Sequence, residues 1–188
     1  MCHPKVNTTK SVSSAFHLNN HQSAKTLNIN VDCNILPADR NPKYLGVTLD
    51  LRLTHRRHLE GSANKIVKRN CLIRKLSGTS WGAPTTVLRT SALALCYSVA
   101  DYCAPVWARS SHTHLVDTKL RDSMRTITGC LKSTPIQWFP VLSGIPPPHL
   151  RRQEANQRSL EKLDNASDNN PLKEICNSAP YSARPKSR

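Results

Sequence analysis

Acidic residues, glycines and aromatic residues are scarce in this chain. Of its 188 residues, 12 are Asp or Glu against 27 Lys or Arg, which gives a formal net charge of +15. No stretch approaches the ~20 apolar residues that a membrane-spanning helix requires, so we expect no such segment. A cationic excess of this size favours a polyanionic partner, nucleic acid first and an acidic membrane surface second.

A secretory signal and a disulfide framework are also missing. The N-terminal residues contain no apolar run of the kind that a signal peptide needs. The cysteines, 7 in all, are odd in number and scattered, and we interpret them as reduced thiols. We therefore expect an intracellular protein, in the nucleus or the cytoplasm, with no membrane partner and no small-molecule substrate.

The residue patterns of catalytic and metal sites are absent as well. No two acidic residues are adjacent, whereas two-metal phosphoryl transfer needs carboxylates that converge on the ions. We interpret Asp50 as part of a turn that leads into a helix rather than as a metal ligand. The sequence has no Cys-x-x-Cys pair, and Cys96 and Cys103 are interpreted as small core residues. We expect no catalytic residue, no metal ligand and no cofactor in this chain.

The first 50 residues show the near alternation of apolar and polar residues that is typical of strands. Runs over 11–18, 26–31 and 44–49 combine β-branched and apolar residues, and turn-forming residues separate them. The pattern predicts three short strands at the edge of an antiparallel sheet.

After Asp50 the apolar residues recur with the helical period of about 3.6 residues. The pattern predicts helices over residues 54–77, 84–103, 113–130, 135–142 and 149–163. The second of them is apolar on nearly every side, which is typical of the centre of a bundle. The predicted fold is therefore α+β and mainly α, with short antiparallel strands followed by a helical bundle. The composition of residues 164–188 is polar, and we expect a disordered tail there.

The helix predicted over 54–77 has one apolar face and one cationic face. Its apolar stripe consists of Leu59, Ala63, Ile66, Asn70 and Ile73. The opposite side carries the cations Arg57, Lys65, Lys68 and Lys75. Ordinary solvated faces mix both signs of charge, whereas the single acid of this segment is Glu60. The pattern favours contact with a phosphate backbone over an ordinary solvated face.

Several short motifs follow one another along the chain. They are Tyr44-Leu45-Gly46-Val47-Thr48-Leu49-Asp50, Asn70–Leu76, Gly78-Thr79-Ser80-Trp81-Gly82-Ala83, Leu88–Leu95, Tyr102-Cys103-Ala104-Pro105-Val106-Trp107, Arg125–Cys130 and Pro147–Arg152. Each motif alone is weak, but together they resemble the thumb and downstream region of reverse transcriptases from jockey-like non-LTR retrotransposons. The resemblance covers residues 5–163.

The resemblance implies roles for individual residues. Lys10 corresponds to the lysine near the phosphates of the incoming nucleotide, and the hairpin that grips the primer corresponds to Tyr44, Leu45 and Gly46. The first thumb helix follows the backbone of template and primer, and its counterparts here are Arg57, Lys65, Lys68, Arg69 and Lys75. Residues 1–50 are then a remnant of the palm edge with primer-grip-like strands, and 51–163 are a thumb-like helical bundle.

The same family places the fingers, most of the palm and the paired catalytic aspartates before this region, and here the chain begins almost on the lysine motif. We therefore expect a fragment of an RNA-directed DNA polymerase from a mobile element, which binds template and primer but does not polymerise alone. The Mg²⁺ of the full-length family enzyme has no expected ligand in this chain. Two alternatives remain open: an independent basic helical protein that binds nucleic acid, and the non-functional product of a pseudogene.

Overall fold

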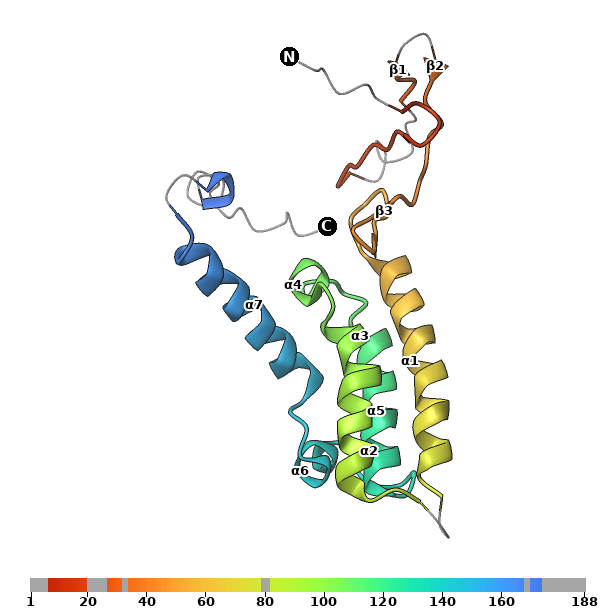
Figure 1. Ribbon diagram of the computed structural model, residues 1–188, viewed down its shortest axis with the longest axis vertical. Helices are drawn as coiled ribbons and strands as arrows, with labels where there is room; N and C mark the ends of the chain where they lie inside the picture. Colours follow the sequence, from red (N-terminus) through yellow and green to blue (C-terminus); the bar gives the residue numbers. More distant parts are fainter. Residues whose placement is uncertain (1–6, 20–26, 32–33, 79–81, 168–169, 174–188) are drawn as a thin grey trace.

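Two small hairpins precede a bundle of helices along the chain (Figure 1). The computed structural model describes residues 7–19, 27–31, 34–78, 82–167 and 170–173. The predicted class is confirmed: the fold is α+β and mainly α, with short antiparallel strands followed by a helical bundle. No helix within these described ranges is long and apolar enough to cross a membrane.

The hairpins are shorter than the predicted strands. β1 (Asn30–Val31) pairs with β2 (Asn34–Ile35), and β3 (Lys43–Tyr44) pairs with β4 (Val47–Thr48), both in antiparallel fashion. The single strand predicted over 44–49 is therefore wrong, because the chain reverses direction within it. Among the described residues the two pairs form separate sheets rather than the edge of one.

The strand predicted over 11–18 is also wrong. Only Ser13 of this segment forms a bridge, a parallel one to Ala38. Its apolar side chains stay largely outside the core, with Val12 51% and Leu18 64% exposed. A strand pair without an apolar face to cover is marginal in water, which explains why the ladder does not extend. Residue 26 of the remaining predicted strand lies outside the described residues.

Helix α1 (Arg56–Leu76) carries the predicted amphipathic stripe. Leu59, Ile66 and Ile73 are fully buried, and Ala63 and Asn70 are nearly so. The helix packs along α5 (His114–Thr128) and along the helix that follows it in the chain. The periodicity thus predicted both the extent of α1 and the face that it buries.

The second predicted helix is continuous, but its middle part is π-helical. It consists of α2 (Thr85–Ala92), the π-helical segment η1 (Leu93–Tyr97) and α3 (Ser98–Asp101). It packs on α1 and α5, but Val87 and Ala94 are exposed. The prediction that this helix has no solvent face is wrong, because its neighbours cover only part of its circumference.

The remaining helices are short except for the last. The structure adds one that was not predicted, α4 (Ala104–Trp107). Tyr102 ends the preceding helix in an extended conformation, and Cys103, with a φ of 51°, leads into α4. η2 (Ile136–Trp138) and α6 (Phe139–Ser143) occupy the predicted segment 135–142. α7 (Pro148–Asp164) confirms the helix predicted over 149–163.

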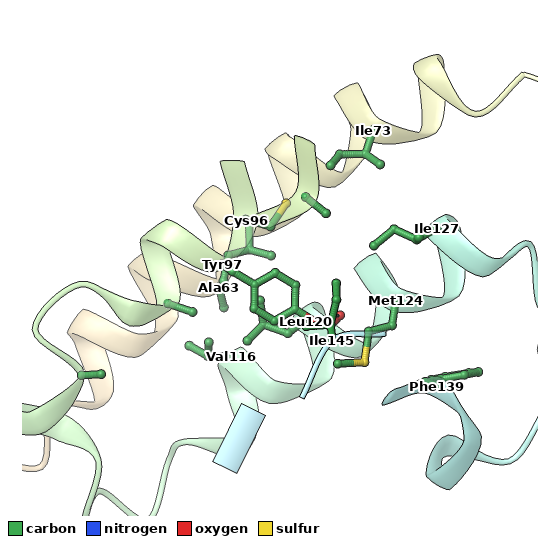
Figure 2. Packing of buried hydrophobic residues seen from close by; sticks show 14 of the residues in the cluster. Ala63, Ile73, Cys96, Tyr97, Val116, Leu120, Met124, Ile127, Phe139 and Ile145 are labelled. Carbon is green, nitrogen blue, oxygen red and sulfur yellow. Dashed lines mark hydrogen bonds between the residues drawn. The ribbon is translucent and has the colours of Figure 1, made fainter. Parts of the chain in front are cut away.

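The apolar core lies between α1, η1 and α5 (Figure 2). The ring of Tyr97 is fully buried there together with Leu120 and Ile145. Its hydroxyl donates a hydrogen bond to the Leu120 carbonyl at 3.4 Å. Because burial raises the pKa of Tyr97 well above its usual range, the ring remains neutral inside the core.

A buried polar cluster around Asn70 joins the same three elements. Its Nδ2 donates to the Lys119 carbonyl of α5 at 2.9 Å, and its Oδ1 accepts from the Ser123 hydroxyl at 2.6 Å. The same Oδ1 accepts from the Cys96 thiol of η1 at 3.2 Å. The interpretation of Cys96 as a core residue is confirmed, and burial raises the pKa of its thiol. One side chain of α1 therefore fixes its register against two neighbours.

Helix α7 is held largely by charged pairs. Arg152 donates through both terminal guanidinium nitrogens to the Asp117 carboxylate of α5, and both residues are buried. The Arg152 guanidinium also lies 5.6 Å from the centre of the Trp107 ring. Beyond α7, Lys173 donates to the Asp164 carbonyl at 3.3 Å, and residues 174–188 of the predicted tail lie outside the described residues.

Replacement of Asn70 by Ala should lower the free energy of unfolding by about 1–3 kcal/mol, since it leaves the buried Lys119 carbonyl and the Ser123 hydroxyl without this partner. The change is measured by urea denaturation. The matched control is Asn64→Ala on the exposed side of α1, which should shift stability by less than ~0.5 kcal/mol. If the two variants had the same urea midpoint of unfolding, the Asn70 cluster would contribute nothing to stability.

Candidate nucleic-acid interface

A turn built on Asp50 sets the point at which α1 begins. Its carboxylate accepts hydrogen bonds from the Thr54 N–H and hydroxyl, at 3.0 and 2.8 Å, and from the His55 N–H at 2.6 Å. Burial opposes the ionised form, but these hydrogen bonds outweigh it and lower the pKa of Asp50. The interpretation of Asp50 as part of a turn that leads into a helix is confirmed.

The cations predicted on the outer side of α1 are all exposed. They are Arg57, Lys65, Lys68 and Lys75, which we call the cationic face. Within the described part of the chain, none of them is in an ion pair. The one acid of the helix, Glu60, pairs instead with Arg56 at 2.8 Å. The cationic face therefore presents uncompensated charge to solvent.

The β3–β4 hairpin carries three predicted site residues at its tip. Leu45 and Gly46 have φ angles of 45° and 80°, as in the type I′ turn of a two-residue hairpin loop. A Cβ at position 46 would also lie only 3.0 Å from the Tyr102 hydroxyl, so both the positive φ and this close approach favour glycine. Tyr44 and Leu45 are 67% and 73% exposed, and the tip therefore presents aromatic and apolar surface to solvent.

Three contacts hold this hairpin against the helices. The side chain of Val47 is buried, and the Tyr102 hydroxyl donates to the Leu45 carbonyl at 2.7 Å. The Thr48 N–H donates to Nδ1 of His58 on α1 at 3.4 Å. The position of the tip relative to α1 is thus set by β4 and by the turn.

His58 is a neutral histidine with a defined tautomer. Because its Nδ1 accepts from Thr48, the neutral ring carries its proton on Nε2. Burial, reinforced by the neighbouring His55 and Lys65, lowers the pKa of His58 below its ordinary value. The ring is therefore uncharged at pH 7 and remains a hydrogen-bond donor through Nε2–H.

Arg69, predicted to contact nucleic acid, also has a structural partner. Its guanidinium donates to the Leu95 carbonyl inside η1. A π-helical turn departs from the regular hydrogen-bond pattern, and here side chains donate hydrogen bonds to its carbonyls. The Ser98 hydroxyl, for example, donates to the Ala94 carbonyl at 2.5 Å. Arg69 thus helps to hold η1, and its half-buried charge has a fixed position.

A cavity of about 290 Å³ lies between the hairpin, α1 and α3. Its cationic lining consists of Lys43 from β3 and of Lys65 and Arg69 from α1, with His58 and Tyr102 beside them. No acidic side chain is among the described residues that line it. The fold therefore gathers positive charge from two separate elements around one hollow.

The predicted site residues are only partly brought together. Gly46, Lys65 and Arg69 meet at the cavity, whereas Lys68 and Lys75 continue along α1 beyond it. Lys10 lies in an exposed turn near the start of the described chain and is not among the cavity residues.

Sequence reasoning missed six residues of the cavity lining: Lys43, His58, Ser62, Ser98, Val99 and Tyr102. Lys43 directly precedes the predicted tip, and that position was the only available signal. Among the described residues, no three His, Cys, Asp or Glu side chains are grouped where they could hold a metal ion, and we assign no metal ligand.

Comparison with known proteins gives no family for this chain. No protein-family model, no curated protein and no solved structure matches it. The resemblance to jockey-like reverse transcriptases therefore stays a prediction. The cationic face and the cavity are therefore the features of this chain that indicate a function.

Because of His58, the free energy of unfolding should decrease as the pH is lowered below about 6.5. Its lowered pKa means that the unfolded chain takes up this proton at a higher pH than the folded protein does. The stabilisation is therefore complete above the unfolded pKa of about 6.5 and is lost as pH falls through the folded value. His58→Asn keeps an acceptor for Thr48 but cannot titrate. Below pH 6.5 its stability should decline less steeply than that of the unmodified protein, by up to ~1.4 kcal/mol per pH unit.

The measurement is urea denaturation between pH 5 and pH 8. His149→Asn, which replaces an exposed histidine at the start of α7, is the matched control. If the free energy of unfolding changed with pH in the same way for the unmodified protein and for His58→Asn, the lowered pKa of His58 would be contradicted.

Proposed function

We propose that this chain binds the phosphate backbone of a nucleic acid, without reading its sequence, through the cationic face of α1. The carrying observation is that its four cations are exposed on one helix and that none is in an ion pair within the described residues. Such cations neutralise phosphates and release condensed counterions, which is the main source of sequence-independent affinity. Among the described residues, they have no salt bridge to give up on binding.

The dimensions of the cationic face suit an extended polyanion. From Arg57 to Lys75 the helix rises about 27 Å at 1.5 Å per residue, the length of about eight base-pair steps. The buried stripe on the other side of α1 prevents the helix from rotating its cations inward. Binding therefore requires little reorganisation of the protein.

The neighbouring hairpin supports the same function. Tyr44 is an exposed aromatic residue next to Lys43, a combination that suits stacking on a base with contact to the adjoining phosphate. We further propose, on the resemblance of the motifs, that the chain is part of an RNA-directed DNA polymerase and holds template and primer in the nucleus or the cytoplasm. An independent nucleic-acid-binding protein would use the same cationic face.

The triple variant with Lys65, Lys68 and Lys75 replaced by Gln tests the cationic face. Affinity for duplex DNA should be independent of sequence, and log K should fall linearly with log salt by about 0.9 for each neutralised phosphate. The triple variant should reduce this slope by up to ~2–3, while α1 persists because Gln is a good helix former. Arg69 is left unchanged because it also holds η1. Fluorescence anisotropy across a salt series measures the slope.

A charge-matched control separates the cationic face from diffuse net charge. Lys132, in the turn after α5, and Arg158 and Lys162, on α7, are exposed cations, and their replacement by Gln removes the same formal charge. Of the three, Arg158 is paired with Glu154. The control should keep most of the salt slope. Equal losses in the two triple variants would mean that α1 is not a binding face, and circular dichroism checks that both remain folded.

A further inference from the structure

We propose that the cavity beneath the β3–β4 hairpin binds a phosphate monoester, such as the terminal phosphate of a nucleic-acid strand; for that source the inference rests on the backbone binding proposed above. The cavity, of about 290 Å³, is lined by β3, α1 and α3. It differs from the cationic face, because Lys65 is the only one of the four face cations that lines it. The two sites therefore meet at one residue and otherwise use different side chains.

The charge around the cavity suits a dianion. Lys43, Lys65 and Arg69 converge from two elements, and the described lining residues include no carboxylate that would neutralise them. Arg69 cannot swing away, because its guanidinium donates to the Leu95 carbonyl. An arginine has five N–H donors, so this contact leaves others for a ligand. Charge-assisted hydrogen bonds of this kind are the strongest that a phosphate receives.

Neutral donors complete the lining. His58 accepts from Thr48 through Nδ1, which leaves Nε2–H as the donor of a ring that adds no repulsive charge to the cavity. Ser62, one helical turn after His58, is also buried at the cavity wall and supplies a hydroxyl. Together these groups offer donors on several sides of a bound oxyanion, as a tetrahedral group requires.

The concave shape of the cavity favours a terminal phosphate over an internal phosphate of a strand. An internucleotide phosphate has a sugar on both sides and lies across a convex surface such as the outer side of α1. A monoester has one ester bond, so it can enter a hollow end-on. It also carries a charge of about −1.5 to −2 near pH 7 and three free oxygens, which match three cations better than the single charge of a diester does.

The test compares duplexes of one sequence that end in a 5′-phosphate, a 3′-phosphate or hydroxyl groups only, by fluorescence anisotropy. The unmodified protein should bind a phosphorylated duplex about tenfold more tightly than the hydroxyl duplex. Lys43→Gln changes an exposed cavity residue outside the cationic face and should abolish this preference. Lys68→Gln, on the cationic face but outside the cavity, should weaken binding of all three duplexes and keep the preference.

Calorimetric titration with inorganic phosphate tests the cavity independently of the cationic face. Saturable binding that Lys43→Gln weakens, without a preference among the duplexes, would support the phosphate site and identify free phosphate as its source. Absence of both the end preference and phosphate binding would overturn the site, whereas salt-dependent binding of all duplexes would still uphold the cationic face. Loss of duplex binding with retained phosphate binding would reject the proposed function alone.

Discussion

The burial of one stripe of α1 is the constraint on which the rest of the molecule depends. Leu59, Ile66 and Ile73 pack into the core between α5 and η1, and Asn70 in the same stripe bonds to both neighbours. The helix can therefore neither rotate nor slide without opening a cavity or leaving buried polar groups unpaired. Its outer cations are consequently held side by side although they repel one another. The polyanion of the proposed function would relieve that repulsion.

Several segments with irregular backbone conformation lie near the cavity. The hairpin turn holds Leu45 and Gly46 at positive φ, η1 is π-helical, and Cys103 beside Tyr102 has a φ of 51°. Two of these departures have a structural consequence here, because the turn brings the tip against Tyr102 and the π segment offers a carbonyl to Arg69. Such conformations cost free energy and persist only where surrounding contacts determine them, which is common at functional sites.

The sequence was sufficient for α1 and insufficient for the cavity, for one physical reason. A period of 3.6 residues is a local property, so the limits of α1, its buried stripe and its cationic face were all predictable from residues 54–77. The turn at Asp50 was predictable on the same local grounds. Strand pairing depends on partners distant in sequence, and the strand predicted over 11–18 failed because its apolar residues find no surface to cover. The lining of the cavity likewise comes from three segments that meet only in the folded chain.

Lys65 links the two candidate sites through a single charge. It belongs to the cationic face by its exposure and to the cavity by its position, whereas Lys43 and Lys68 belong to one site each. A strand whose terminal phosphate occupied the proposed site could continue past Lys65 to Lys68, the next cation along α1 in one direction. The phosphates nearest that end would then meet the cationic face directly. Under the two proposals, cavity and face would form one continuous path for a strand, because the charge at position 65 contributes to both.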